Sequence, residues 1–352
     1  MVINGSAVGV GNPCYVIAEA GSNHDGNLET ALKLVDAAAD AQCDAIKFQT
    51  FRGPDIASAY VDDDVRLPES LARWGGNLEE FYASFALPDE FHEELVGHAN
   101  QRGIMFLSSP FSETAVDRLA KLQVPALKIA SFELVHLPLI EHAANTGIPL
   151  ILSTGMAGLG DIERALNAVV KGGGKQVSLL HCGSSYPLEE SGANLAVMET
   201  LRRAFGVPVG YSDHTQGLGV PVAVAALGGN ILEKHITLSR AGDGPDHSFA
   251  IEPDELKAMV RLIREAEAGI GKPQKRRLHE EEEHARRGRR SLFSSQALPV
   301  GHIVTADDIK VVRPGSGIEP MFFDLLIGRR AVRSVDEDHP LSWDDFMSEG
   351  GE

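Results

Sequence analysis

The chain has 352 residues and a formal net charge of −18, which argues against a nucleic-acid-binding surface because such a surface needs a basic field. Its apolar content of 43% and charged content of 23% are ordinary for a soluble globular protein, and its length fits one large domain and a small one. No apolar run reaches the roughly 18 residues of a membrane helix, and the N-terminal segment lacks a basic stretch followed by an apolar one, so we expect a cytoplasmic protein with no membrane partner.

Short apolar runs alternate with helical patterns along most of the chain. Each run is followed at once by polar residues, and the runs span residues 15–18, 45–48, 104–107, 126–130, 149–152, 177–180, 207–211 and 230–232. Apolar residues at helical spacing predict helices at 28–41, 88–102, 113–122, 137–145, 161–171, 195–205 and 253–270. A helix of small residues is also expected between the last two runs. Residues 52–76 break the pattern with a polar stretch that indicates a long loop over one face.

The alternation predicts eight β/α units in residues 1–271. Eight units in about 250 residues are typical of a β/α (TIM) barrel, whose active site lies at the C-terminal ends of the strands. An open, doubly wound sheet is the rival fold, but it rarely uses eight evenly spaced units, and no Gly-rich dinucleotide motif follows the first run. After the barrel we expect a charged linker at 272–290 and a small domain of short strands and turns at 291–352.

Two histidines, His214 and His235, follow successive apolar runs and are 21 residues apart, about the length of one β/α unit. They would therefore lie side by side at one edge of the barrel. Two imidazoles with open positions suit a divalent ion that acts as a Lewis acid on a carbonyl. A single histidine at a strand end is more often a structural, hydrogen-bonded residue, and this interpretation applies to His24, His181 and His302.

Two lysines, Lys47 and Lys128, lie inside apolar runs, where an ammonium group is costly unless it meets an anion. If both side chains point inward, they form an anion site with the hydroxyls of Ser131, Ser153 and Ser212. Such a site suits a phosphate together with a carboxylate. If they point outward, they extend to solvent at a strand and helix junction.

Other functions are compatible with parts of this pattern. A Schiff-base aldolase would use one lysine as the nucleophile and would need no metal. A binding protein could instead recognise a carbohydrate or a surface through the C-terminal domain. The reactive polar groups that follow so many of the strands favour an enzyme over a binding protein.

A series of motifs along nearly the whole chain resembles the sialic acid (N-acetylneuraminate) synthase family. The motifs are IAEAG at 17–21, NHDG at 23–26, KFQT at 47–50, KIAS at 128–131, LSTGM at 152–156, LHC at 180–182, YSDHT at 211–215, EKH at 233–235 and GPDH at 244–247. The segment RPGSGI at 313–318 resembles the C-terminal antifreeze-like (SAF) domain of that family.

The resemblance implies a transferase that condenses phosphoenolpyruvate with an N-acylated hexosamine, N-acetylmannosamine or a relative. The products would be a nine-carbon 2-keto sugar acid and phosphate, with cleavage of the C–O bond. A divalent ion, Mn²⁺ or Mg²⁺, would be held by His214 and His235 and would polarise the aldehyde of the open-chain sugar. The enol carbon would attack that aldehyde, and water would then add to the resulting cation.

The same resemblance assigns roles to further residues. Phosphoenolpyruvate would contact Lys47, Ser109, Lys128, Ser131, Ser153, Ser184 and Ser212. The sugar and its aldehyde would face Glu19, Gln49, Tyr186 and Asp246. Glu133 would position water. Arg313 would reach the N-acyl group from the partner subunit, which requires a domain-swapped homodimer.

Some positions depart from the pattern of the family. Phe48 stands where some members have a histidine, and Ser184 stands where some have an asparagine. Residues 60–85 look somewhat like pseudaminic acid synthases, and residues 244–250 are intermediate between subgroups. A pseudaminic or legionaminic acid synthase that uses a diacetamido-dideoxyhexose is therefore the alternative.

Overall fold

The computed structural model describes residues 1–60, 67 and 69–346, except for the side chains of residues 69 and 70. The chain divides into two compact units, residues 1–271 and residues 272–352, and each is described by itself. None of the helices in the described residues is long and apolar enough to cross a membrane.

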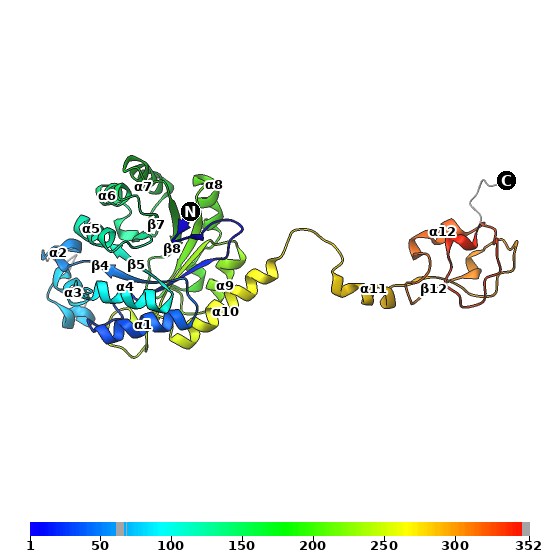
Figure 1. The fold of residues 1–352 in the computed structure, drawn as a ribbon, viewed down its shortest axis with the longest axis horizontal. Helices are drawn as coiled ribbons and strands as arrows, with labels where there is room; N and C mark the ends of the chain where they lie inside the picture. Colours follow the sequence, from blue (N-terminus) through cyan, green and yellow to red (C-terminus); the bar gives the residue numbers. More distant parts are fainter. Residues whose placement is uncertain (61–66, 68, 347–352) are drawn as a thin grey trace. The chain divides into compact units, whose positions relative to one another are not determined.

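In the described part of the first unit, eight parallel strands form a closed barrel, as the sequence predicts (Figure 1). The strands are β3 (Tyr15–Glu19), β4 (Ala45–Thr50), β5 (Met105–Pro110), β6 (Leu127–Ile129), β7 (Leu150–Ser153), β8 (Val177–Cys182), β9 (Val209–Asp213) and β10 (Ile231–His235). Each strand pairs with the next in the chain, and β10 closes the barrel by pairing with β3. In that pairing, His235 lies opposite Glu19.

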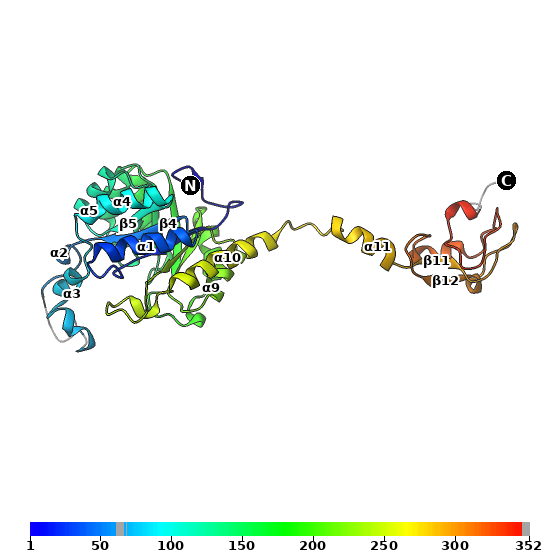
Figure 2. The same ribbon diagram turned by 60° about the horizontal axis from the view of Figure 1, so that its bottom comes forward.

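Helices surround the barrel (Figures 1 and 2). They are α1 (Leu28–Asp40), α4 (Phe91–Arg102), α5 (Glu113–Lys121), α6 (Leu137–Asn145), α7 (Leu159–Lys171), α8 (Val197–Phe205), α9 (Gly219–Ala226) and α10 (Pro253–Ile270). Outward-facing strand residues such as Val16, Ile46 and Phe48 pack against the apolar faces of these helices and form the main core. The predicted helices agree with the observed ones to within a few residues.

The segment expected to be a long loop at 52–76 contains helical turns, so that prediction is wrong for the described residues. They include α2 (Gly53–Ile56) and a short 3₁₀ helix at Glu69–Trp74, and α3 (Leu78–Ser84) follows. Asn77 caps α3 by accepting a hydrogen bond from the backbone N–H of Glu80 at 2.9 Å. Gly53 lets α2 approach α3 closely, because a Cβ atom there would lie 2.4 Å from the carbonyl oxygen of Glu79.

The N-terminal end of the barrel is closed by a hairpin of β1 (Val2–Ile3) and β2 (Ser6–Ala7). Ile3 of this hairpin and Val8 just after it pack against a second apolar cluster built from inward-facing strand residues. That cluster contains Tyr15, Ile17, Ala45, Leu107, Ala126, Ile151, Leu180 and Ile231. The lower half of the barrel is therefore filled mainly by apolar side chains, and the polar groups of the pocket gather in the C-terminal half.

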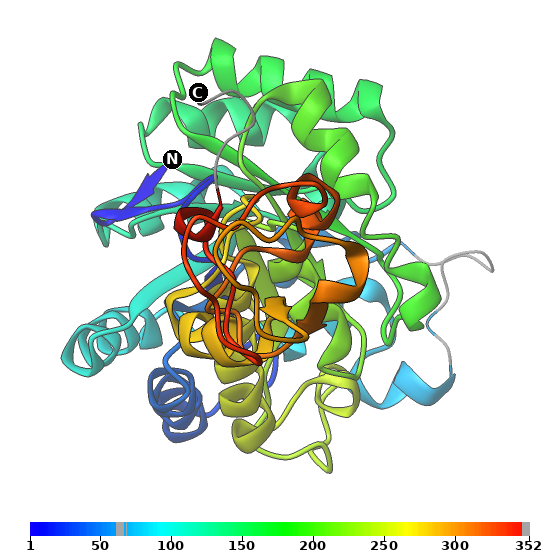
Figure 3. The same ribbon diagram turned by 90° about the vertical axis from the view of Figure 1, so that its right-hand side faces the viewer.

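The second unit consists of short elements and turns (Figure 3). The segment expected to be a charged linker contains the exposed helix α11 (Glu282–Gly288). Strands β11 (Ser291–Ser294) and β12 (Ile309–Val312) pair antiparallel, and α12 (Phe323–Leu326) follows. Leu292, Leu298, Val304, Leu326, Val335 and Leu341 are members of its own small core.

Candidate active site

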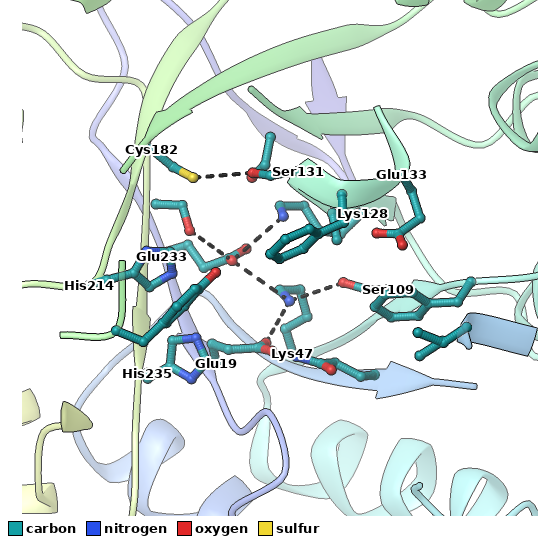
Figure 4. A pocket seen from close by; sticks show the side chains of 18 of the residues that line it. Glu19, Lys47, Ser109, Lys128, Ser131, Glu133, Cys182, His214, Glu233 and His235 are labelled. Carbon is teal, nitrogen blue, oxygen red and sulfur yellow. Dashed lines mark hydrogen bonds and ion pairs between the residues drawn. The ribbon is translucent and has the colours of Figure 1, made fainter. Parts of the chain in front are cut away.

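A pocket opens at the C-terminal ends of the barrel strands (Figure 4). Most of the residues that the sequence singles out line it: Glu19, Lys47, Gln49, Ser109, Lys128, Ser131, Glu133, Ser153, Tyr186, Ser212, His214 and His235. Ser184 and Asp246 lie just behind the lining residues. Arg313 belongs to the second unit, where it is exposed, and the structure does not place that unit relative to the pocket.

The alternation of strand side chains explains why these groups converge. In a barrel strand, every second residue points inward. Glu19 follows Ile17, and Lys47 follows Ala45, so each polar group lies one inward position above an apolar one. The polar residues thus form a layer directly above the apolar filling of the barrel.

Both lysines point into the barrel, which settles the question that the sequence left open. Lys47 Nζ lies 2.6 Å from Glu19 Oε2 and 3.1 Å from Ser109 Oγ. The Nζ atoms of Lys47 and Lys128 each lie 3.7 Å from Oε1 of Glu233, and Ser212 Oγ donates a hydrogen bond to the same oxygen at 3.2 Å. The two cations therefore share one buried carboxylate.

The charges in this cluster follow from burial and proximity. Burial opposes ionisation of Glu233, but the nearby ammonium groups of Lys128 and Lys47 outweigh it and hold the pKa of Glu233 at about 2. Burial lowers the pKa of Lys128, and Glu233 offsets part of that effect. For Lys47, burial also opposes the charged form, yet Glu19 and Glu233 together raise its pKa. Lys47 is therefore held as an ammonium ion.

Two carboxyl groups in the pocket have a raised pKa. Burial raises the pKa of Glu19, although Lys47 opposes the shift, and Gln49 Nε2 donates a hydrogen bond to Glu19 Oε1 at 2.9 Å. Burial also raises the pKa of Glu133 to about 7, and the buried Oε2 atom of Glu133 has no hydrogen-bond partner. A carboxyl group with such a pKa can both accept and donate a proton near neutral pH.

His214 and His235 lie side by side, with ring centroids 5.5 Å apart. His214 Nδ1 donates a hydrogen bond to the carbonyl oxygen of Gly183 at 2.9 Å. In the neutral ring the free lone pair is therefore on Nε2. His235 Nδ1 is buried without a hydrogen-bond partner. Burial lowers the pKa of both residues, that of His214 to about 4 with a contribution from His235, so both rings are neutral at pH 7.

This donor set fits a divalent ion. Neutral imidazoles are good ligands for such ions, and the Nδ1 atom of His235 is buried without a hydrogen-bond partner. Among the residues that the structure describes, no group of three or more His, Cys, Asp or Glu is arranged to hold a metal. An ion at the two histidines would therefore take its remaining ligands from water or substrate, as an open catalytic site requires.

Small polar groups at the ends of β6, β7 and β8 form a cradle beside Lys128. The backbone N–H of Gly155 donates to Ser131 Oγ at 3.1 Å, and Ser131 Oγ lies 3.2 Å from Cys182 Sγ. Ser184 Oγ lies 3.8 Å from the same sulfur, and Ser153 Oγ is buried without a partner. Hydroxyl groups next to a buried ammonium group suit an oxyanion such as phosphate.

Asp246 stands behind His235. Its Oδ2 atom accepts hydrogen bonds from the backbone N–H and the Oγ of Ser22 at 3.2 and 3.0 Å, and it lies 3.9 Å from His235 Nδ1. The next residue, His247, bridges Thr237 Oγ1 at 2.7 Å and Asp25 Oδ1 at 2.9 Å. These contacts join the loops after β3 and β10 and fix Asp246 at the edge of the site.

The sequence prediction missed several residues of the pocket. Glu233 is the most important, and its position two residues before His235 on the same strand was a usable signal. Glu233 and Cys182 both lie in motifs that the sequence singles out, but neither was assigned a role in the site. Ile56, Tyr82, Phe111 and Phe132 also line the pocket, and none of them was assigned a role from the sequence.

Known proteins resemble this chain along nearly its whole length. A sequence profile of the NeuB family matches residues 34–275, and a profile of the SAF domain matches residues 289–347. The chain is 37% identical over 325 residues to the N,N'-diacetyllegionaminic acid synthase of Campylobacter jejuni, covering 92% of this chain and 97% of that protein. It is 33% identical over 341 residues to the human N-acetylneuraminate-9-phosphate synthase, covering 96% of this chain and 94% of that protein.

Among solved structures, the chain is similar to the N-acetylneuraminic acid synthetase of Leptospira borgpetersenii, which was crystallised in complex with citrate. The two share 33% sequence identity, and the TM-score is 0.70. The match covers 81% of this chain and 94% of that chain.

Proposed function

The chain belongs to the NeuB family of sugar acid synthases, and we propose that it joins phosphoenolpyruvate to an N-acylated hexosamine. The products are a nine-carbon 2-keto sugar acid and inorganic phosphate. One observation carries the proposal: a single pocket holds an anion site of two lysines and several hydroxyls on one side and a pair of neutral histidines on the other. These are two substrate sites that face each other.

The reaction forms one C–C bond and breaks one C–O bond. C3 of phosphoenolpyruvate attacks the aldehyde carbon, and the aldehyde oxygen takes a proton to become a hydroxyl. Water adds to C2 and loses a proton, and the bond between C2 and the bridging oxygen then breaks as the new hydroxyl at C2 gives its proton to the departing phosphate. The new ketone forms at C2.

The residues of this chain divide these tasks between them. Lys47 and Lys128, together with the hydroxyls of the cradle, bind the phosphate and carboxylate of phosphoenolpyruvate. Glu133, with its raised pKa and unpartnered Oε2 atom, takes the proton from the attacking water. Gln49 and Glu19 face the sugar. A divalent ion, Mn²⁺ or Mg²⁺, would be held by His214 and His235 and would supply Lewis acidity at the aldehyde oxygen.

The test follows the fate of the bridging oxygen. Phosphoenolpyruvate labelled with ¹⁸O at that position is incubated with sugar and Mn²⁺, and the phosphate is analysed by ³¹P NMR. We expect phosphate release only when all three are present, with the label in the phosphate. Label retained in the sugar acid, or release that a chelator does not affect, would contradict the proposal.

A Schiff-base aldolase is the second candidate, and the lowered pKa of Lys128 is the observation in its favour. Lys47 is unsuitable as a nucleophile because its two carboxylate partners hold it as an ammonium ion. Borohydride should therefore trap either an adduct on Lys128 or nothing. We expect no adduct with either substrate.

We further propose that the protein acts as a domain-swapped homodimer in which Arg313 enters the partner subunit's pocket. The sequence resemblance and the exposed position of Arg313 support this proposal. Inactive His235→Ala subunits mixed with inactive Arg313→Ala subunits should regain part of the activity after subunit exchange. Failure to regain activity in exchanged dimers would contradict the swap.

A further inference from the structure

The residues that precede the two histidines in the chain form a buried ion pair. Asp213 is the last residue of β9 and comes directly before His214, and Lys234 comes directly before His235 at the end of β10. Lys234 Nζ lies 2.6 Å from Asp213 Oδ2, and both side chains are buried. In the parallel pairing of β9 with β10, the two residues lie opposite each other. The ion pair therefore joins the two strands that lead to the histidines.

This ion pair lies outside the pocket. Successive side chains of a strand point to opposite faces, and Ser212 and Glu233, one residue earlier on each strand, line the pocket. Asp213 and Lys234 therefore point away from the pocket, and neither of them lines it. Any part that they play in the reaction must be exerted through the residues that they hold.

Lys234 binds the backbone on both sides of His214. Its Nζ atom donates hydrogen bonds to Asp213 Oδ2 and to the carbonyl oxygen of Thr215, each at 2.6 Å. Asp213 Oδ1 in turn accepts hydrogen bonds from the backbone N–H and the Oγ1 of Thr215 at 3.0 and 2.9 Å. The turn that contains His214 is thus held by an ammonium group from the strand of His235.

The backbone pairing of the sheet does not fix the spacing of the two histidines. The pairing of β9 with β10 ends at Asp213 and Lys234. His235 still pairs with Glu19 of β3, but His214 lies beyond the end of β9. The distance of 5.5 Å between the centroids of the two rings therefore depends on the contacts that hold the turn around His214.

Contacts from two neighbouring strands hold this turn. On the side of β8, His214 Nδ1 donates a hydrogen bond to the carbonyl oxygen of Gly183, and the backbone N–H of Leu188 donates to the carbonyl oxygen of His214, each at 2.9 Å. On the side of β10, Lys234 provides the connection. Loss of Lys234 would leave His214 attached to β8 but loosened from the strand that carries His235.

Stability alone is a weak reason for a buried ion pair at this position. The desolvation of two ions offsets most of their attraction, and uncharged side chains of similar volume are often equally stable. Directional hydrogen bonds from one ammonium group to a carboxylate and a carbonyl oxygen instead fix a geometry. A metal site benefits from such contacts because ligands that are already in place need no ordering when the ion binds.

We infer that Lys234 and Asp213 are positioning residues of the metal site, whose ion pair holds His214 at the spacing from His235 that one divalent ion requires. The inference rests on the proposed function, in which the two histidines hold that ion. Neither Lys234 nor Asp213 contacts the ion or the substrates. They act through the backbone of the turn that carries His214.

Lys234→Met tests the inference because it removes the ammonium group and keeps a long side chain. Binding of Mn²⁺ without substrates and binding of phosphoenolpyruvate are each measured by calorimetry. We expect Mn²⁺ affinity to fall by about 10- to 100-fold, the range found when groups that orient metal ligands are removed. Phosphoenolpyruvate affinity should change far less, because Lys47 and Lys128 are unaltered. Equal Mn²⁺ affinity of parent and variant would overturn the inference alone, whereas no Mn²⁺ binding by the parent would also overturn the proposed metal site.

A double variant separates positioning from stability. Lys234→Met leaves the carboxylate of Asp213 buried without its counter-ion, which destabilises the fold. Lys234→Met combined with Asp213→Asn removes both charges and keeps a carbonyl oxygen to accept from Thr215. We expect the midpoint of urea unfolding to return toward that of the parent, while Mn²⁺ affinity stays low. Recovery of Mn²⁺ affinity together with stability would show that the pair serves the fold alone, and would overturn the inference.

The matched control is Arg264→Met, which removes a cation that joins two other strands. Arg264 donates hydrogen bonds to the carbonyl oxygen of Cys14 at 2.9 Å and to Asp44 Oδ2 at 3.2 Å, and these residues directly precede β3 and β4 at the N-terminal end of the barrel. Arg264→Met should lower stability but leave Mn²⁺ affinity unchanged. If it weakened Mn²⁺ binding as much as Lys234→Met does, the effect would come from a loosened barrel and the inference would be wrong.

Discussion

Glu233 Oε1 lies 3.7 Å from Lys128 Nζ, and both side chains are buried. In the described part of the chain, Glu233 is the one carboxylate within ion-pair distance of Lys128, whereas Lys47 also has Glu19. Removing one partner of a buried ion pair leaves the other charge uncompensated, at a cost of about 3–5 kcal/mol. Glu233→Gln should lower the free energy of unfolding by about that amount, as measured by urea denaturation at pH 7.

An exposed ion pair provides the control for this variant. Glu29 pairs with Lys33 on α1 at 2.7 Å, and the two side chains are 77% and 58% exposed. Exposed pairs contribute about 0–1 kcal/mol, so Glu29→Gln should remain close to the parent protein. Equal stability of the two variants would show that the buried cluster tolerates an unpaired lysine.

Metal binding should depend on the histidine pair. His235→Ala removes one of the two neutral imidazoles and should abolish Mn²⁺ binding measured by calorimetry in the absence of substrates. Activity should fall by orders of magnitude, because Lewis acidity supplies several kcal/mol of transition-state stabilisation. His142→Ala, which alters a histidine paired with Asp117 on the outer helices, should bind Mn²⁺ like the parent. Unaltered Mn²⁺ binding by His235→Ala would show that His235 is not a ligand of the metal ion.

Most of the barrel and half of the site could be read from the sequence because they depend on local periodicity. The apolar runs have polar residues at their ends, and a barrel places those ends at one mouth. The positions of Lys47, Lys128 and the two histidines at strand ends therefore predict that they lie together, without any knowledge of packing. The same reasoning applies equally to Glu233, which faces the same interior two residues before His235.

The rest of the site depends on contacts that no local pattern encodes. Ile56 and Tyr82 reach the pocket because Gly53 lets α2 pack closely on α3, a relationship that is visible only in three dimensions. Asp246 reaches His235 because Ser22, from a distant part of the chain, holds its carboxylate. Arg313 stays a sequence-based prediction, since the two units are described separately.

The raised pKa of Glu133 predicts a dependence of stability on pH. Burial raises this pKa from its ordinary 4.5 to about 7, with Lys128 opposing the shift. Between these values the folded protein keeps a proton that the unfolded chain has lost, so the contribution of Glu133 to stability decreases as pH rises, by up to about 1.4 kcal/mol per unit.

Comparison with Glu133→Gln isolates this effect. Glu19 and the histidines titrate in both proteins, so their contributions cancel in the difference between the two unfolding free energies. The glutamine that replaces Glu133 does not titrate. The unfolding free energy of the parent minus that of the variant should therefore decrease from pH 4.5 to 7 and then level off, as followed by urea denaturation at a series of pH values. A difference that increases with pH would show that Glu133 is stabilised in its ionised form.

Gly155 tests the anion cradle without altering any of its polar groups. Its backbone φ lies outside the left-handed region, so alanine is compatible with the backbone, but a Cβ atom would lie 2.2 Å from Ser184 Oγ, 2.8 Å from Cys182 Sγ and 2.9 Å from Ser131 Oγ. These side chains must move, and the loss of one well-placed hydrogen bond costs about 1–3 kcal/mol. Gly155→Ala should therefore weaken phosphoenolpyruvate binding by about tenfold or more, measured by calorimetry, and leave Mn²⁺ binding intact.

In the control Gly160→Ala, the new methyl group lies on α7 at an ordinary 3.7 Å from its nearest neighbour, Arg164, and binding of both ligands should be unchanged. If Gly155→Ala bound phosphoenolpyruvate as tightly as this control, the phosphate would have to lie elsewhere in the pocket.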